Sequence, residues 1–167
     1  MYFFLDGYNL LFTALESKLP LQKQRQHFVV WMQEEFAKGD LQGTIVFDGA
    51  HRREEESGLS YPSPLVVAYT PKGQTADEYI VEQLETAKNA KIITVVTNDA
   101  GLKRHAHATG AKTQSNATFL QWLIKRAKKK KPKSQSLKET DYQIKRLVQI
   151  FEDRLKKGSV DDLEGWE

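Results

Sequence analysis

Short apolar runs alternate with longer amphipathic stretches along this chain. The apolar runs predict strands over residues 2–5, 44–49, 65–69 and 91–99, with a short edge strand over 111–115. Most runs are continuously apolar rather than alternating, which is typical of strands buried on both faces, and the helical stretches between them favour parallel pairing. The pattern therefore predicts an α/β fold with a mostly parallel central sheet.

Helical spacing of apolar residues predicts the connecting elements. Helices are expected over residues 21–38, 75–90, 100–110, 116–130 and, after a break at Pro132, 136–157. A polar loop that contains prolines is expected over 50–64. We expect residues 1–130 to form one domain and residues 131–167 to form a helical extension packed on it or docking beside it.

Composition and charge limit the classes of protein to which this chain can belong. The chain has no cysteine, which excludes disulfides, thiolate metal sites and a cysteine nucleophile. Its apolar start is too short for a signal peptide or a membrane span, so a cytoplasmic protein without a membrane partner is expected. Residues 1–120 hold 12 Lys+Arg against 14 Asp+Glu, whereas residues 121–157 hold 13 against 4. This division predicts an acidic body and a basic arm with different roles.

Four aspartates occupy comparable places in the predicted sheet. Asp6, Asp48 and Asp99 each follow a strand, and Asp77 lies in the first turn of the helix after the third strand. The carboxyl ends of parallel strands meet at one edge, where ligands bind in open α/β sheets. Carboxylate oxygens are the ligands that Mg²⁺ and Mn²⁺ prefer. We therefore expect a divalent-metal site at this edge.

Each acid also has a purely structural interpretation. Asp6-Gly7 and Asp48-Gly49 are possible turns, since Asp-Gly is a strong hairpin signal. The strands before them do not alternate and no matching strand follows, which argues against hairpins. Asp99 has the alternative of being a helix cap. The occurrence of four such acids together favours the metal site over four separate structural roles.

Helical phase separates Asp77 from its neighbour Glu78. Asp77, Ile80 and Leu84 fall at i, i+3 and i+7, so Asp77 shares the apolar face of its helix. Thr75 and Glu78 have the spacing of a capping box. In the purely structural interpretation, Asp77 only adds a favourable negative charge at the positive end of the helix dipole. A carboxylate on the inward face needs a compensating charge. We therefore expect Asp77 to be a ligand and Glu78 to cap the helix.

The segments "LDGYNLL", "IVFDGAH", "TADEYI" and "VVTND", in this order, resemble the NYN domain, most closely its bacterial YacP-like branch within the PIN-like nuclease group. The resemblance spans about residues 2–130, and the final helix is similar to the YacP-like layout. It implies a three-layer α/β/α PIN-like fold and endonucleolytic hydrolysis of RNA with one or two Mg²⁺ or Mn²⁺ ions. The family's acids correspond to Asp6, Asp48, Asp77 and Asp99, and its amide corresponds to Asn9. Whether the RNA is met on the ribosome stays open.

Asn9 has two interpretations of its own. It lies one helical turn beyond Asp6, where its amide would hold a phosphate oxygen or a water on the metal. Alternatively, it caps a helical segment that starts at Leu10.

Basic and aromatic residues supply candidates for RNA binding. The basic candidates are Arg52, Arg53, Lys125, Arg126, Lys128, Lys129, Lys130, Lys131 and Lys133. Seven of them lie within residues 125–133 and form either a phosphate-binding patch or a solvated helix end. Arg52 and Arg53 follow Asp48 and would hold substrate near the metal. Tyr8, Tyr61 and Trp122 are candidates for stacking on bases.

Two other functions compete with the nuclease. A haloacid-dehalogenase-like phosphatase also starts with an acid after a strand, but it needs an Asp-x-Asp pair and Tyr8 stands at the second position. A non-catalytic RNA- or ribosome-binding module would keep the same fold and basic arm. A zinc site is not expected, because His105 and His107 are two residues apart on a predicted helix and point in different directions.

Overall fold

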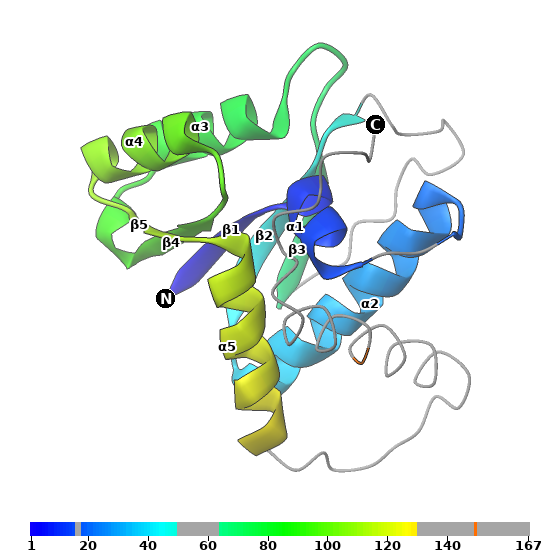
Figure 1. The fold of residues 1–167 in the computed structure, drawn as a ribbon. Coiled ribbons are helices and arrows are strands. Elements are labelled where there is room, and N and C mark those ends of the chain that lie inside the picture. Colours follow the sequence, from blue (N-terminus) through cyan, green and yellow to red (C-terminus); the bar gives the residue numbers. More distant parts are fainter. Residues whose placement is uncertain (16–17, 50–63, 130–148, 150–167) are drawn as a thin grey trace.

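Five parallel strands form one sheet in the computed structural model, which describes residues 1–15, 18–49, 64–129 and 149 (Figure 1). The strand order across the sheet is β3-β2-β1-β4-β5. The strands are β1 (Tyr2–Asp6), β2 (Gln42–Phe47), β3 (Leu65–Tyr69), β4 (Ile93–Val96) and β5 (Lys112–Gln114). Every neighbouring pair is parallel, with Phe4 of β1 opposite Thr44 of β2 and Val95 of β4.

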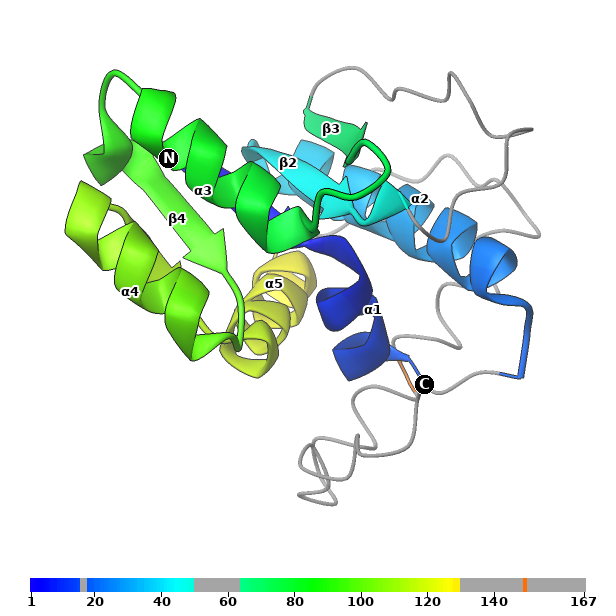
Figure 2. The same ribbon diagram turned by 90° about the horizontal axis from the view of Figure 1, so that it is seen from above.

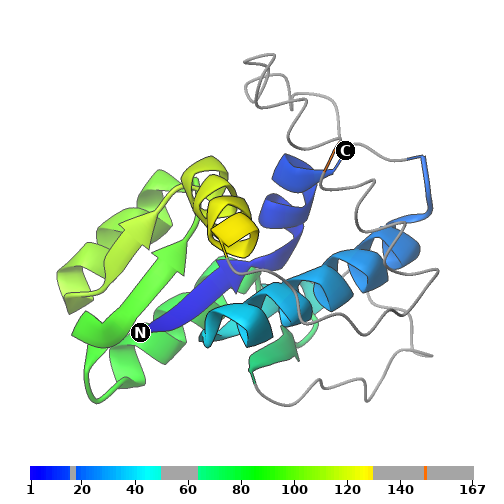
Figure 3. The ribbon, with the colours of Figure 1, turned by 90° about the horizontal axis from the view of Figure 1, so that it is seen from below.

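Helices cover both faces of this sheet. The helices are α1 (Gly7–Ala14), α2 (Leu21–Gly39), α3 (Ala76–Thr86), α4 (Ala100–Thr109) and α5 (Asn116–Lys129), with a 3-10 turn η3 (Ala90–Ile92) before β4. One apolar cluster joins the sheet to α1, α2 and α5, and a second joins it to α3 and α4. Figures 2 and 3 show the two sets of helices from above and below. The three-layer α/β/α fold expected from the family resemblance is confirmed.

The strand residues alternate between these two clusters, which explains why the runs look continuously apolar. Phe3 and Leu5 of β1 point into the cluster with α1, α2 and α5, whereas Phe4 points into the cluster with α3 and α4. Burial of both faces leaves no polar side for β1. This strand therefore holds a fixed position at the centre of the sheet, and its carboxyl end is fixed with it.

The connection pattern changes direction at β1. The chain continues from β1 to β2 and β3 on one side, and then crosses to β4 and β5 on the other. Such a switch point leaves a crevice outside the carboxyl ends of the two strands that flank it, here β1 and β4. Asp6 ends β1 and Asp99 follows β4 by three residues. The topology therefore directs both acids to one crevice.

The predicted elements agree with the structure except that α1 was not predicted, the strand expected over 91–99 covers only Ile93–Val96, and the boundaries of other elements shift by a few residues. No hairpin turn follows Asp6, because α1 begins directly at Gly7. A side chain at residue 7 would collide with Phe47, whose ring lies 2.5 Å from an added Cβ, so only glycine allows this close approach. The helix expected over 75–90 ends at Thr86 and is followed by η3. The predicted extension over 131–167 lies outside the described residues apart from Gln149.

No helix among the described residues has both the length and the apolar composition needed to cross a membrane.

Candidate active site

Three of the four predicted acids come together at the carboxyl edge of the sheet. Asp6 ends β1, Asp77 lies in the first turn of α3, and Asp99 stands directly before α4. The carboxyl groups of Asp6 and Asp77 share a hydrogen bond, and Asp99 is close enough to raise the pKa of both. The sequence prediction that these distant residues meet is therefore correct for this trio.

The electrostatics of the trio favour protonation. Burial raises the pKa of Asp6 above its ordinary value, the Asn9 side chain and backbone act against this shift, and the charge of Asp99 adds to it. Burial, followed by the charges of Asp6 and Asp99, raises the pKa of Asp77 to about 6. Both carboxylates are therefore harder to ionise together than a free aspartate, because burial and the neighbouring negative charges oppose it. A cation at this place would offset that repulsion.

Asp99 both caps a helix and contributes to the site. Its Oδ1 accepts a hydrogen bond of 2.7 Å from the backbone N–H of Leu102, and its own N–H donates to Thr97 Oγ1 at 3.0 Å. The capping alternative is therefore correct, but the cap uses only one of the two carboxylate oxygens. Because the cap fixes the side chain, the charge of Asp99 is held in place beside Asp6 and Asp77.

Asn9 positions Asp6 and does not cap a helix. Residue 6 takes the capping position, and Asn9 lies inside the first turn of α1. Its Nδ2 donates to Asp6 Oδ2 at 3.1 Å. The amide therefore orients one carboxylate of the trio, and the alternative in which Asn9 caps a segment from Leu10 is wrong.

Asp48 directly follows β2, the strand next to β1, and lies near a group of polar residues around Tyr8. Arg25 of α2 is only 2% exposed, and its Nη1 donates to the Tyr8 hydroxyl at 2.8 Å. The guanidinium also lies 5.5 Å from the centre of the Tyr69 ring. Burial raises the pKa of Tyr8, Arg25 opposes this, and Asp48 adds to the increase. Asp48 thus acts on Tyr8, whereas the main shifts at Asp6 and Asp77 come from other groups.

Sequence reasoning missed Arg25 and misjudged Tyr8. Arg25 falls at i, i+3, i+4 and i+7 with Phe28, Val29 and Met32, so a charged residue on an apolar helical face was a usable signal. Tyr8 is buried and hydrogen-bonded to Arg25, so its ring is not available for the stacking on a base that the sequence predicts.

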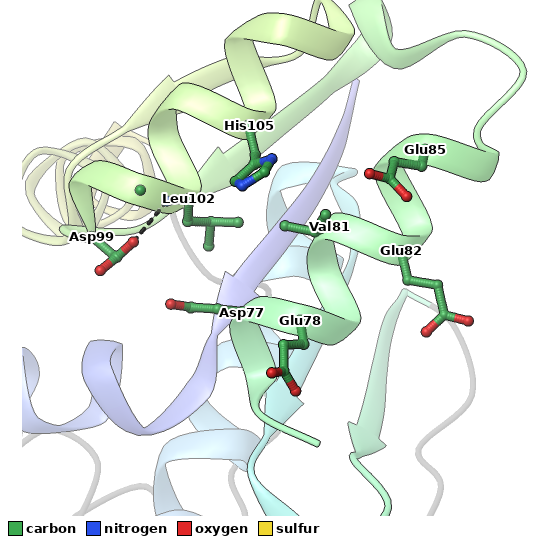
Figure 4. A pocket seen from close by; sticks show the side chains of 9 residues that line it. Asp77, Glu78, Val81, Glu82, Glu85, Asp99, Leu102 and His105 are labelled. Carbon is green, nitrogen blue, oxygen red and sulfur yellow. Dashed lines mark hydrogen bonds between the residues drawn. The ribbon is translucent and has the colours of Figure 1, made fainter. Parts of the chain in front are cut away.

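A pocket of about 400 Å³ between α3 and α4 contains Asp77 and Asp99 (Figure 4). It is lined by Asp77, Glu78, Val81, Glu82, Glu85, Asp99, Gly101, Leu102 and His105. Glu78 forms the predicted capping box, in which its Oε2 accepts from Thr75 N at 3.0 Å and Thr75 Oγ1 accepts from Glu78 N at 3.2 Å. The pocket therefore opens from the acid trio along the facing sides of the two helices.

The comparisons with known proteins agree with this arrangement. A family model described as the YacP-like NYN domain matches residues 3–167. The chain belongs to this family. NYN domains are generally nucleases of the PIN-like group, which supports assigning this YacP-like NYN protein to the hydrolases. A haloacid-dehalogenase-like phosphatase is thereby set aside.

Two solved structures share the fold of this YacP-like NYN protein. One is a crystal structure of a point mutant of Rae1 (YacP) from Bacillus subtilis, with a TM-score of 0.61, 20% identity, and coverage of 96% of this chain and 98% of that chain. The other is Rae1 (YacP) from the same organism, with a TM-score of 0.58, 19% identity, and coverage of 96% and 86%. A search of curated proteins gives no match.

The acid trio of this NYN domain has the chemistry of a site for a hard cation. Within residues 1–15, 18–49 and 64–129, no three His, Cys, Asp or Glu side chains already stand at ligand distance from one point. Mg²⁺ often binds through one or two carboxylates and keeps several waters, so the contacting pair Asp6 and Asp77 with Asp99 beside it is sufficient. The raised pKa values of Asp6 and Asp77 show that negative charge is concentrated at this place. The donor set therefore fits such an ion.

The basic candidates divide into exposed and structural residues. Lys125 and Lys129 are exposed on α5. Arg126 is half-buried, with its Nη2 donating to the Gly39 carbonyl at 2.6 Å and its guanidinium 5.4 Å from the centre of the Trp122 ring. Trp122 itself packs against Phe3, so both residues have a structural use. The predicted contacts through Arg52, Arg53, Tyr61, Lys128, Lys130, Lys131 and Lys133 lie outside the described side chains.

Proposed function

We propose that this chain is a ribonuclease that hydrolyses RNA phosphodiester bonds endonucleolytically with the help of Mg²⁺ or Mn²⁺. The observation that carries the proposal is the meeting of Asp6, Asp77 and the helix-capping Asp99 at the switch point of a NYN fold, where burial and mutual repulsion raise the pKa values of Asp6 and Asp77. Strongly perturbed carboxylates that meet at such a point are typical of functional sites. Acting on RNA also fits the cytoplasmic location expected from the sequence.

Asp6 and Asp77 would hold the ion, with Asp99 as a further ligand or a fixed neighbouring charge. A bound divalent ion supplies polarisation of the scissile phosphate and a lower pKa for an attacking water. Asn9 keeps Asp6 aimed at the site through its 3.1 Å hydrogen bond. In the hydrolysis, the water oxygen bonds to phosphorus and gives up a proton to solvent or a nearby carboxylate, the bond from phosphorus to the leaving ribose oxygen breaks, and that oxygen takes up a proton from solvent.

Asp48 has a different role from the other three aspartates in the proposed reaction. It lies half-buried after β2 beside the Tyr8 and Arg25 pair, on the opposite side of β1 from Asp99. We propose that it joins the site when substrate and ion are bound, either as a ligand through water or by orienting the attacking water. Its replacement by Asn should therefore lower the rate less than replacement of Asp6 or Asp77.

The alternative is a non-catalytic RNA- or ribosome-binding module on the same fold, and a cleavage assay separates the two. Purified protein is incubated with end-labelled single-stranded RNA, structured RNA and DNA, each with Mg²⁺, Mn²⁺ or EDTA. We expect internal cleavage of RNA that needs the metal and stops with EDTA. Tight, salt-sensitive binding without cleavage on any RNA, including ribosome-bound RNA, would favour the binding module.

The exposed lysines of α5 should contribute to RNA affinity in a way that Arg126 does not. Lys125→Ala should weaken RNA binding and reduce the slope of log affinity against log salt by about 0.7, the value for one phosphate contact on a single strand. Its free energy of unfolding should stay within about 0.5 kcal/mol of the unmodified protein. Salt-dependent fluorescence anisotropy and urea unfolding measure the two quantities.

Arg126→Ala serves as the matched comparison for Lys125→Ala. It removes the hydrogen bond to Gly39 and the contact with Trp122, so it should lower the free energy of unfolding by about 1–3 kcal/mol. An unchanged salt slope for Lys125→Ala would argue that RNA does not cross this face of α5.

A further inference from the structure

The pocket between α3 and α4 is larger than the acid trio requires. Asp77 and Asp99 lie at one end, and the pocket continues past Val81 and Leu102 to His105 (Figure 4). Its volume of about 400 Å³ is within the range of sites for small organic ligands. The part beyond the acids is therefore available to a portion of the substrate other than the reacting phosphate.

The charge of this part excludes a second phosphate. Glu82 and Glu85 of α3 line it together with Asp77 and Asp99, so an anion would be repelled. A nucleobase carries no charge at neutral pH, and its amino groups donate hydrogen bonds that carboxylates accept. Among the chemical groups of RNA, a base with an amino group therefore fits this lining best.

The walls of the pocket also match a flat, partly apolar group. The partly exposed Val81 offers apolar surface above the buried Leu102, and the imidazole of His105 is directed into the space between the two helices. Bases in single-stranded RNA commonly stack on aromatic rings, including that of histidine. His105 follows Asp99 by six residues, which corresponds to about 9 Å along α4. A single nucleotide spans such a separation between its phosphate and its base.

The carboxylates of the pocket differ in whether they already accept hydrogen bonds from other residues. Glu78 is used by the capping box, and Glu82 Oε2 accepts from Gln74 Nε2 at 3.0 Å. Neither Glu85 nor His105 has a hydrogen bond to another described residue. His107, by contrast, lies outside the pocket lining and its Nε2 is 2.9 Å from Thr113 Oγ1. Glu85 and His105 are thus the residues that a base would meet, and His107 is a natural control.

We propose that this pocket binds the nucleobase adjacent to the cleaved phosphodiester, with His105 stacking on the base and Glu85 accepting a hydrogen bond from its exocyclic amino group. The proposal deepens the proposed ribonuclease function and rests on it for the position of the cleaved bond. It gives the enzyme a preference for adenine, cytosine or guanine over uracil at one side of the cleavage site.

Cleavage of a random-sequence RNA pool, read out by sequencing of the ends, tests the preference. His105→Ala should lower kcat/KM about 5- to 150-fold, the equivalent of losing one base stack, and flatten the base preference. His105→Phe should retain most of both because it keeps an aromatic ring. Glu85→Gln should reduce discrimination against uracil, and His107→Ala should leave rate and preference unchanged. An unaltered preference in both His105→Ala and Glu85→Gln would overturn the proposal.

A titration with phosphate-free nucleosides separates this proposal from the ribonuclease function. Adenosine, cytidine, guanosine and uridine are added to the intact protein while the imidazole C–H signals of His105 and His107 are followed by NMR. We expect the His105 signal to shift with the three amino-bearing nucleosides and the His107 signal to stay in place. Absence of any shift specific to His105 would overturn the base pocket even if RNA is cleaved. A specific shift without RNA cleavage would support the pocket while contradicting the ribonuclease.

Discussion

Replacing Asp77 by Asn should abolish RNA cleavage while the protein remains folded. The side chains of Asp77 and Asp6 interact, so an amide at residue 77 can donate a hydrogen bond to Asp6 but removes the charge that a divalent ion needs. We expect kcat/KM to fall on the order of 10³-fold or more, which corresponds to about 4 kcal/mol of lost transition-state stabilisation. Asp6→Asn and Asp99→Asn should have effects of the same order.

Asp40→Asn is the matched control for these variants. Asp40 caps the C-terminus of α2 with φ 53°, a conformation that asparagine also adopts readily. It precedes β2 and so lies at the edge of the sheet opposite the acid trio. Its activity should equal that of the unmodified protein in single-turnover assays on labelled RNA. Wild-type-like cleavage by any two of the three trio variants, in preparations free of contaminating nuclease, would disprove the assignment of the metal site.

The sheet was predictable because β1, β2 and β4 are buried on both faces. Leu5, Ile45 and Val96 pack against one layer of helices, whereas Phe4 and Val95 pack against the other. Continuous apolar runs are the signature of such strands. The helix at Gly7 was not predictable in this way. Its start depends on the contact of Gly7 with Phe47, a residue 40 positions away, and local patterns do not record such a contact.

The identities of the acids in the candidate site could be predicted from the sequence, but their contacts with other residues could not. The positions of Asp6, Asp77 and Asp99 follow from strand ends and helical phase, which are properties of local sequence. The surroundings of Asp48 include Tyr8, whose hydroxyl accepts a hydrogen bond from the buried Arg25 of another helix, and this contact could not be predicted. The pocket beyond Asp77 likewise depends on how α3 and α4 face each other. Sequence therefore identified the acids that meet at the candidate site, whereas packing determined their partners.

The metal-free protein should become less stable as pH rises from about 4 to about 6, and Asp77→Asn should remove this loss. The pKa of Asp77 is about 6 in the folded protein, mainly because of burial and the charge of Asp6, against an ordinary value of 3.8. Between these values the folded protein binds more protons than the unfolded chain, so the free energy of unfolding falls with rising pH. The loss is complete about one pH unit above 6, and we expect it to amount to about 1–2 kcal/mol because Asp77 is partly exposed and solvent screens its charge interactions.

Urea unfolding followed by tryptophan fluorescence in EDTA measures this difference at several pH values. The unmodified protein and Asp77→Asn should have similar stabilities near pH 4, and the variant should be the more stable one at pH 7. Millimolar Mn²⁺ should raise the stability of the unmodified protein at pH 7, since the ion offsets the repulsion between the ionised Asp6 and Asp77, and it should raise that of Asp77→Asn much less. The prediction would be contradicted if the free energies of unfolding of the two proteins changed equally with pH and rose equally with Mn²⁺. Repulsion between Asp6 and Asp77 would then not be the cause of either effect.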